Sequence, residues 1–207
     1  MDKATPGAIR FVSSGLLLPN SSIRIVTDSG VIAPECHVGE IQIQSDCLFS
    51  GYYNRPDLTK QAIIDEWYRT GDLGFILDGE LYVVGRKKDL LIIGGENLYP
   101  QDIEEIVSTH PAVHDGRVVA TGIYNRDLGT EEIVIVAEVE DEVVLPDSPQ
   151  VEQEIRAKVV AGLGVSVRTI FLKPPRWIVK STAGKPARAA TREKLMQEHP
   201  EFRSEEE

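Results

Sequence analysis

The hydrophobic pattern of this 207-residue chain changes its period near Lys88, and this change limits the possible folds more than any other feature. Before Lys88, the segments Ser22–Val26 and Glu40–Gln44 alternate apolar and polar side chains. Alternation of this kind is the pattern of half-buried strands. The first part of the chain is therefore expected to be rich in β-structure.

Two local signals complete the first part. Pro56 suits the first turn of a helix, which we predict over residues 57–64. Two short apolar segments flank Asp78-Gly79, and glycine accepts the positive φ that a type I′ hairpin turn requires. Residues 1–87 are thus predicted to form a β-rich subdomain.

After Lys88, helical and strand patterns alternate along the chain. Pro100 suits the start of a helix, and the apolar side chains of residues 151–163 recur every four positions on a second helix. We therefore predict that residues 88–207 form a small α+β domain, which is large enough to have its own core. Its further predicted elements are strands at residues 90–93, 118–120, 133–139 and 165–172, and a helix at residues 190–199.

The composition excludes several classes of protein. The chain has 27% charged and 42% apolar residues, the balance of a soluble globular protein, and its net charge of −11 argues against a general nucleic-acid binder. No apolar run approaches the length of a membrane span, and the first ten residues lack the apolar core of a signal peptide. Two cysteines, Cys36 and Cys47, are too few for a disulfide framework. We expect a cytoplasmic protein with a disordered acidic tail at about residues 203–207.

Charge is distributed unevenly in the second part of the chain. Residues 155–192 contain no acidic residue. Such a gap in an acidic protein indicates either a site protected for an anion or a chance run of solvated bases, and the two interpretations carry equal weight. The bases in this stretch are Arg156, Lys158, Arg168, Lys173, Arg176, Lys180, Lys185, Arg188 and Arg192.

Two motifs surround the predicted hairpin. Residues 67–74, Trp-Tyr-Arg-Thr-Gly-Asp-Leu-Gly, put Asp72 beside a glycine at an expected strand end, where a carboxylate can accept two hydrogen bonds from a vicinal diol. Residues 85–89, Gly-Arg-Lys-Lys-Asp, supply the Arg86 guanidinium, which can bind a sugar or a phosphate. Taken alone, Asp72 is more typical of a turn, and Arg86 of an exposed strand end.

Two further motifs lie in the second part. Residues 94–104 begin with paired glycines, which let a backbone pass close to a ligand, although an ordinary turn has the same pattern. In residues 180–188, Gly184 frees a loop and Lys185 can place a point charge near phosphate oxygens, although a surface lysine is the commoner interpretation. His110 and His114 are four residues apart, but Pro111 prevents a shared helix face, so we expect no metal site.

In this order and spacing, the four motifs resemble those of the adenylate-forming superfamily, which includes acyl-CoA synthetases, fatty acyl-AMP ligases, luciferases and peptide-synthetase adenylation domains. The resemblance runs from Gly39 through Arg188. It implies that residues 1–87 are the last β-rich subdomain of a large adenylation domain, and that residues 88–207 are a mobile small domain. The family's phosphate-binding loop, adenine-contacting segment and acyl pocket lie upstream of the matched region.

The resemblance also implies roles for single residues. Asp72 and Arg86 match nucleotide-binding residues that hold the ribose, and Lys88 matches the hinge about which the small domain rotates. Lys185 matches the catalytic lysine that holds the carboxylate and the α-phosphate. The positions that match the thiol-acceptor tunnel are Gly94, Gly95, Glu96 and Asn97. Two positions depart from the family pattern, Val179 where proline is usual and Pro186 where an aliphatic residue is common.

The implied protein is an ATP-dependent ligase that forms acyl-AMP from a fatty acid and passes the acyl group to CoA or to the phosphopantetheine of a carrier protein. Mg²⁺ would be held mainly by the upstream domain. The residues around Asp72 look like the acyl-AMP ligases, whereas Gly94–Asn97 look like the CoA ligases. The alternative is a non-catalytic, stand-alone small domain that complements or regulates a partner chain. A module that binds ATP without acyl chemistry is disfavoured because the chain contains no phosphate-binding loop.

Overall fold

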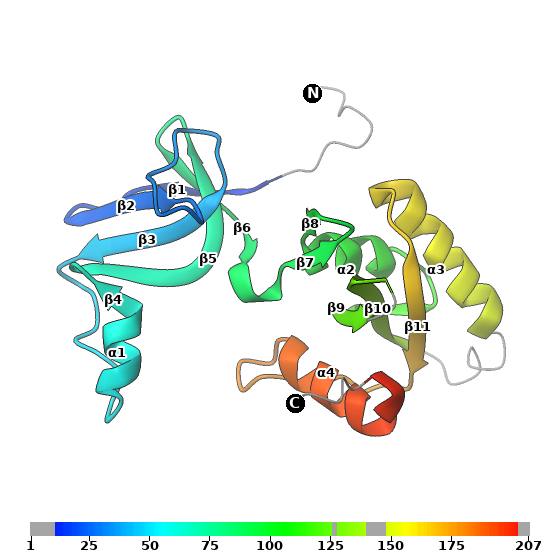
Figure 1. The fold of residues 1–207 in the computed structure, drawn as a ribbon. Coiled ribbons are helices and arrows are strands. Elements are labelled where there is room, and N and C mark those ends of the chain that lie inside the picture. The colour runs from blue at the N-terminus through cyan, green and yellow to red at the C-terminus, as the bar shows by residue number, and fades with distance from the viewer. Residues whose placement is uncertain (1–10, 126–127, 140–147, 203–207) are drawn as a thin grey trace. The chain divides into compact units, whose positions relative to one another are not determined.

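The computed structural model describes residues 11–125, 128–139 and 148–202 (Figure 1). The expected disordered tail at residues 203–207 and the first ten residues lie outside this description. The chain divides into two compact units, unit 1 (Met1–Asp89) and unit 2 (Leu90–Glu207).

Unit 1 is built on one antiparallel sheet with the strand order β1-β6-β5-β3-β2, and β4 pairs with β5. Its strands are β1 (Ser13–Leu16), β2 (Ser21–Val26), β3 (Gly39–Ser45), β4 (Ile63–Ile64), β5 (Trp67–Leu77) and β6 (Glu80–Arg86), followed by a 3-10 helix at Lys87–Asp89; the one α-helix among its described residues is α1 (Pro56–Ala62).

The predicted strands and hairpin of unit 1 are confirmed, whereas the predicted helix is too long. Ile25 of β2 pairs with Ile41 of β3, and both are buried. Asp78 and Gly79 connect β5 and β6 with φ values of 52° and 77°, the positive pair that a type I′ turn needs. The helix ends at Ala62 because the β-branched Ile63 adopts an extended conformation and pairs with β5.

Unit 2 has a three-stranded sheet in the order β11-β10-β9, in which β10 is antiparallel to β9 and parallel to β11. A separate two-stranded hairpin, β7–β8, precedes it. The elements are β7 (Leu91–Ile93), β8 (Glu96–Leu98), α2 (Pro100–Ser108), β9 (Val113–Asn125), β10 (Thr130–Val139), α3 (Ser148–Leu163), β11 (Val167–Lys173), α4 (Arg188–Glu198) and a 3-10 helix at Pro200–Phe202.

The central strand β10 separates two hydrophobic cores. Ile133, Ile135 and Ala137 point to one face, where they pack with α2, α3 and Leu91. Val134 and Val136 point to the other face, where they pack with α4 and with Ile178. The sheet of unit 2 therefore lies between α2 and α3 on one side and α4 on the other (Figure 1).

The helix predicted after Pro100 and the four-residue apolar repeat of α3 are confirmed. The predicted buried strand at residues 90–93 is wrong in its burial. Leu91 is buried, but Ile92 is 54% exposed, because the hairpin lays only one side on the core. The strand predicted at residues 118–120 extends much farther, over Val113–Asn125. None of the helices in the described residues combines the length and hydropathy needed to cross a bilayer.

Candidate functional site

Asp72 and Arg86 lie opposite each other on the neighbouring strands β5 and β6. Arg86 Nε is 3.2 Å from Asp72 Oδ1. The Asp72 side chain is 34% exposed and that of Arg86 is 60% exposed, so both present polar atoms to solvent. The predicted strand end at Asp72 is wrong, because β5 begins five residues earlier, at Trp67, and Asp72 lies inside the strand.

A bulge and a threonine fix the carboxylate of Asp72. Gly71 has a φ of 73°, and the pairing of β5 with β6 changes register between Leu73 and Gly74. Thr70 Oγ1 accepts a hydrogen bond from the Asp72 N–H (3.0 Å) and donates one to the Ile41 carbonyl of β3 (2.8 Å). Thr70 stands two residues before Asp72 in the same motif, and this role of its side chain becomes visible only in the structure.

A hollow of about 500 Å³ opens beside this pair in unit 1. Tyr52 and Tyr68 lie on its wall, and their mutual hydrogen bond, with a smaller contribution from burial, raises the pKa of Tyr68. Asp72 does not line the hollow but lies 3.2 Å from Arg86, which does, and a carboxylate beside bases suits a phosphorylated sugar with a vicinal diol. The residues that line the hollow are Tyr52, Tyr68, Thr70, Gly71, Arg86, Lys87 and Lys88.

Lys88 lies in the 3-10 helix that ends unit 1, two residues before unit 2 begins at Leu90. Its side chain is exposed. The neighbouring Lys87 differs, because its Nζ donates a 2.6 Å hydrogen bond to Asp28 and thereby lowers the pKa of that carboxyl group. Lys88 therefore stands at the junction of the two units, and its hinge role stays a prediction.

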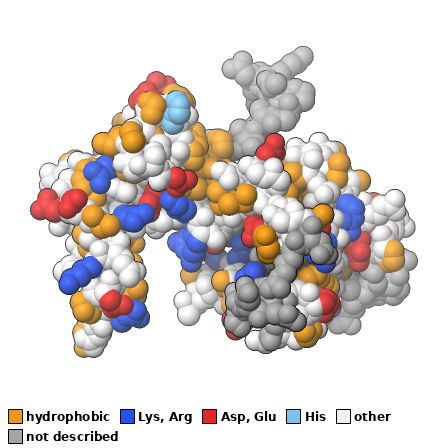
Figure 2. Space-filling view, viewed as in Figure 1, with side chains coloured by type: hydrophobic (Ala, Val, Ile, Leu, Met, Phe, Trp, Pro, Cys, Tyr) orange, Lys and Arg blue, Asp and Glu red, His pale blue; other side chains and the backbone are white. Residues whose placement is uncertain are grey.

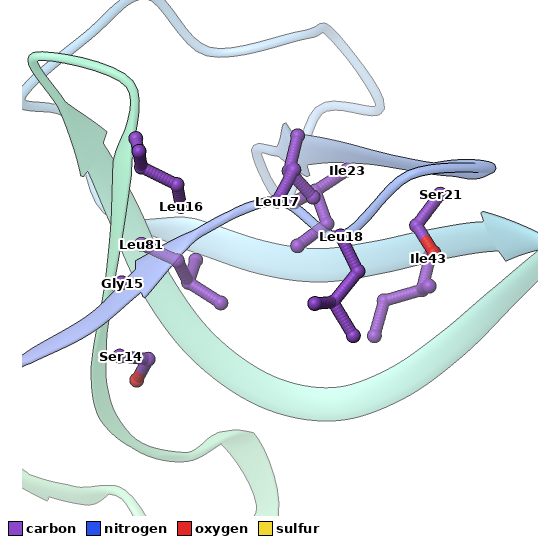
Figure 3. Close-up of a pocket in the computed structure, with 9 residues that line it drawn as sticks. All are labelled: Ser14, Gly15, Leu16, Leu17, Leu18, Ser21, Ile23, Ile43 and Leu81. Carbon is purple, nitrogen blue, oxygen red and sulfur yellow. The ribbon is translucent and has the colours of Figure 1, made fainter.

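A second hollow of unit 1, of about 220 Å³, is apolar (Figure 3). The side chains of Leu17 and Leu18 from the segment after β1 approach Ile23 and Ile43 of the sheet, as Figure 3 shows. Leu18 is 75% exposed despite this contact. No titratable side chain lines this hollow, and it shares no lining residue with the hollow beside Arg86.

Gly94 and Gly95 form the two-residue turn between β7 and β8. Their φ values are 59° and 86°, so both adopt a conformation that glycine favours. A Cβ atom at either position would meet nothing within 4 Å, and Glu96 and Asn97 are exposed beside them. The glycines are thus required by the backbone conformation, and the outer side of the turn is open.

Polar side chains of β10 hold this hairpin. Glu131 Oε2 accepts a hydrogen bond from the Ile92 N–H (3.1 Å), and Thr130 Oγ1 accepts one from the Gly94 N–H (3.1 Å). The neighbouring strand β9 has Gly122 at this point, where a Cβ atom would lie 2.7 Å from the Glu131 carboxylate. Gly122 therefore leaves the space that the carboxylate occupies.

Lys185 lies on a loop closed by backbone hydrogen bonds. The Ala187 N–H donates to the Val179 carbonyl (2.8 Å), and the Ser181 N–H donates to the Lys185 carbonyl (2.8 Å). Gly184 permits the turn with a φ of 80°. The Lys185 side chain is exposed, and no carboxylate of the residues that the structure describes forms an ion pair with it.

Two carboxylates fix the ends of this loop. Glu138, which is 1% exposed, accepts a 2.7 Å hydrogen bond from the Ile178 N–H. At the other end, the Arg188 guanidinium donates to both oxygens of Glu104, at 3.0 and 2.8 Å. No sequence motif indicates these anchoring roles of Glu104, Glu131 and Glu138, because each binds a partner 39 to 84 residues away.

Three bases of the acid-free stretch at residues 155–192 form ion pairs with acidic residues from outside the stretch. Arg168 pairs with Glu132, Lys173 with Glu198, and Arg188 with Glu104. Figure 2 shows basic and acidic side chains interspersed on the visible surface of the described residues. Among the described residues, Lys185 forms no ion pair with an acidic residue. It shares this property with five other bases of the stretch, which are Arg156, Lys158, Arg176, Lys180 and Arg192.

The predicted structural role of His110 is supported by its contacts. His110 is 4% exposed, its Nε2 lies 2.9 Å from Glu154, and its Nδ1 accepts a hydrogen bond from the Ala112 N–H. This arrangement fits a neutral ring with its proton on Nε2. Within the described residues, no group of three or more His, Cys, Asp or Glu side chains is placed to hold a metal ion.

No protein-family model matches the chain. A provisionally named fatty-acid–CoA ligase, fadD21 of Mycobacterium leprae (strain TN), is 36% identical over 186 residues, which are 81% of this chain and 31% of that protein. The 2-succinylbenzoate–CoA ligase of Bacillus cereus (strain Q1) is 44% identical over 108 residues, 52% of this chain and 22% of that protein.

Solved structures give the same relationship. A structure from a study of fatty acyl-adenylate ligases of E. coli and L. pneumophila has a TM-score of 0.79 and 34% identity, and the match covers 92% of this chain and 33% of that one. McyG A-PCP complexed with phenylalanyl-adenylate has a TM-score of 0.82 and 28% identity, covering 93% and 34%. This chain therefore spans about a third or less of the length of these relatives. The chain belongs to the adenylate-forming superfamily of acyl-CoA ligases and adenylation domains, and it matches a carboxyl-terminal portion of those proteins.

Proposed function

We propose that this chain is the carboxyl-terminal part of a ligase that activates a fatty acid with ATP as acyl-AMP and then transfers the acyl group to a thiol. The longer protein is called the full-length ligase below. The observation that carries the proposal is the position of Lys185, an exposed lysine on a loop that Glu138 and Arg188–Glu104 fix at both ends. The names of the relatives, a fatty-acid–CoA ligase and fatty acyl-adenylate ligases, support the substrate class.

Lys185 is the proposed catalytic residue of the first half-reaction. A carboxylate oxygen of the fatty acid attacks the α-phosphorus of ATP, the new P–O bond forms, and pyrophosphate leaves. The two reacting groups are both anions, so a preorganised ammonium group lowers the barrier. ATP supplies the adenylyl group, and we assign Mg²⁺ mainly to the upstream part of the full-length ligase.

Asp72 and Arg86 are the proposed ribose-binding residues. The carboxylate of Asp72 can accept hydrogen bonds from the 2′- and 3′-hydroxyls of the nucleotide, and Thr70 holds the backbone that carries it. The Arg86 guanidinium, 3.2 Å from Asp72, can donate to the sugar or to a phosphate.

The glycine turn is assigned to the second half-reaction. The thiol of CoA or of a carrier protein's phosphopantetheine attacks the acyl carbonyl carbon, and AMP leaves. Gly94, Gly95, Glu96 and Asn97 would line the path of the thiol, which suits a turn whose outer side is open. Lys88 is the proposed hinge between residues 1–87, the end of the large domain, and residues 88–207, the mobile small domain. We place the full-length ligase in the cytoplasm.

Exchange of labelled pyrophosphate into ATP and trapping of acyl hydroxamates, measured over a panel of fatty acids, test this proposal. Lys185→Ala should lower the exchange rate of the full-length ligase by about 100-fold, which corresponds to about 3 kcal/mol. The same variant should still transfer the acyl group from supplied acyl-AMP to a thiol. Lys180→Ala is the matched control, because Lys180 is an exposed lysine of the same loop and should leave both rates unchanged.

Equal losses in both half-reactions would contradict the role of Lys185. The 207-residue chain alone should show no exchange with any acid. Full-length protein that binds ATP but forms no hydroxamate would favour the alternative of a non-catalytic module.

A further inference from the structure

The tip of the glycine hairpin, residues 91–98, is held by a few polar contacts. Leu91 is buried and Ile93 and Leu98 pack against the core, but Ile92 and residues 94–97 are exposed, so the apolar packing holds the base of the hairpin and does not reach the turn. The Ile92 N–H and the Gly94 N–H donate to Glu131 and Thr130, and Thr130 Oγ1 in turn donates to the Ile92 carbonyl (3.3 Å). Removal of the Glu131 carboxylate therefore leaves the Ile92 N–H of β7 without its side-chain acceptor.

The lysine loop, residues 178–188, is also exposed along most of its length and is also held at its ends. Glu138 accepts the Ile178 N–H, and Arg117 lies 3.8 Å from its other oxygen. Glu104 of α2 accepts a 2.9 Å hydrogen bond from the Ala120 N–H of β9 and binds Arg188, the first residue of α4. Glu104 thus connects the helix on one face of the sheet with the helix on the other.

The two carboxylates of β10, Glu131 and Glu138, lie on opposite faces of the sheet. Glu131 follows the odd-numbered positions of β10, which face α2, α3 and the glycine hairpin. Glu138 follows the even-numbered positions, which face α4 and the lysine loop. The two carboxylates stand at opposite ends of one central strand that is hydrogen-bonded on both sides. Loss of one of these two carboxylates therefore leaves the hydrogen bond of the other intact.

We propose that Glu131 is a positioning residue for the glycine hairpin and that Glu104 and Glu138 are positioning residues for the lysine loop, so that each set governs one half-reaction. This inference rests on the proposed function for the assignment of half-reactions, but the anchoring itself does not. A displacement of about 1 Å in a reacting group can lower a rate by about 100-fold. The loss of an anchor should therefore affect the half-reaction of its own loop.

Amide hydrogen exchange of the 207-residue chain tests the anchoring without any activity. In Glu131→Ala, exchange at Ile92 and Gly94 should accelerate at least about tenfold, with Ile178 and Ala187 unchanged. Glu104→Ala should accelerate Ala120 and Ala187 and leave Ile92 unchanged. Glu132→Ala and Glu105→Ala, the adjacent carboxylates, are the matched controls and should alter neither loop.

Three further variants guard against a general loss of structure. Gly122→Ala keeps the carboxylate but forces it away from the Ile92 N–H, so it should reproduce the exchange pattern of Glu131→Ala. Glu131→Gln and Glu104→Gln retain an acceptor oxygen and should restore most of the protection. Uniform acceleration across unit 2, or no change at the named amides, would overturn the inference.

The two half-reactions of the full-length ligase give the second measurement. Glu131→Ala should lower thiol transfer about tenfold or more and spare pyrophosphate exchange, and Glu104→Ala should do the reverse, with partial recovery in the glutamine variants. The same two rates are measured for Lys185→Ala. If Lys185→Ala leaves exchange intact, the proposed function fails and hydrogen exchange still decides the anchoring. If Lys185→Ala abolishes exchange and the anchor variants slow both steps equally, only the inference fails.

Discussion

The two units differ in where their apolar side chains lie. Both hydrophobic core clusters found among the described residues belong to unit 2, where β10 is buried on both faces. In unit 1, the buried apolar residues are few, and the segment around β1 exposes large side chains such as Leu16 at 71% and Leu18 at 75% (Figure 3). Unit 2 is thus a domain with its own core, whereas unit 1 is a sheet whose apolar face needs further cover.

This difference extends to the candidate sites. Asp72 and Arg86 of unit 1 are placed by strand pairing, so their separation is set by the register of β5 and β6. Lys185 and the paired glycines of unit 2 lie on exposed turns, and carboxylates attached to the core set their positions. A domain with a stable core can therefore position site residues on exposed loops. In a sheet without such a core, strand pairing has to position the site residues.

Separation of the units should give the largest effect. Residues 90–207 alone should unfold in one cooperative thermal transition, because they retain both cores. Residues 1–89 alone should show no such transition and should bind a hydrophobic dye, since about 25 cal/mol is lost for each Å² of apolar surface left uncovered. Circular dichroism and dye fluorescence of the two fragments measure this. A cooperative transition in residues 1–89 would contradict the comparison.

Substitution of one glycine in each unit by alanine gives a matched pair of tests with a smaller expected effect. At Gly74 of β5, a Cβ atom would lie 2.4 Å from the Tyr82 carbonyl oxygen, a backbone atom of the paired strand. Gly74→Ala should therefore destabilise unit 1 by about 1–3 kcal/mol or more. At Gly162 of α3, the contact is the flexible end of Ile106 at 2.7 Å, and alanine improves the helix propensity. Gly162→Ala should change the free energy of unfolding by less than about 1 kcal/mol.

Chemical denaturation of the full-length ligase, in which unit 1 has its further cover, measures Gly74→Ala. Denaturation of the 207-residue chain, followed through Trp177 of unit 2, measures Gly162→Ala. A larger loss of unfolding free energy for Gly162→Ala than for Gly74→Ala would show that unit 1 accommodates an added methyl group more easily than its strand contacts indicate.

The smallest effect concerns pH and a surface contact of unit 2. The hydrogen bond from Lys173 lowers the pKa of Glu198 below its ordinary value of 4.5, and Trp177 Nε1 also donates to this carboxylate (3.0 Å). Because the pKa is lowered in the folded state, the contribution of Glu198 is present above about pH 4.5 and is lost as the pH falls below it. The contribution is below about 1 kcal/mol, since the pair is exposed. Glu198→Gln should flatten the acid side of the stability curve, and an unchanged slope would argue against this ion pair.

Local patterns predicted much of the fold. The turn at Asp78-Gly79, the helix after Pro100 and the apolar repeat of α3 all follow from short-range chemistry. The start of β5 was missed because Gly71 and the polar residues of its motif hide the strand period, and the bulge absorbs the irregularity. Ile63 was placed in a helix because its pairing with Tyr68 depends on the fold of the chain.

The candidate site was predictable only where its residues form motifs. Asp72, Arg86 and Lys185 stand in recognisable sequence patterns, and strand pairing brings the first two together. The anchors were not predictable, because Glu131 and Glu138 accept hydrogen bonds from backbone N–H groups, which every residue except proline offers. A single sequence carries no record of which amide lies opposite which carboxylate.

Calorimetric binding of ATP and of 2′,3′-dideoxy-ATP to the full-length ligase and its Asp72→Ala variant tests the central claim, that this chain holds the ribose of a nucleotide. We expect Asp72→Ala to weaken ATP binding roughly 10- to 100-fold and to leave the dideoxy nucleotide unaffected, because the lost hydrogen bonds go to the two hydroxyls. Asp46→Ala, an exposed aspartate of unit 1, should change neither affinity. Equal weakening of both nucleotides by Asp72→Ala, or no weakening of either, would contradict the account.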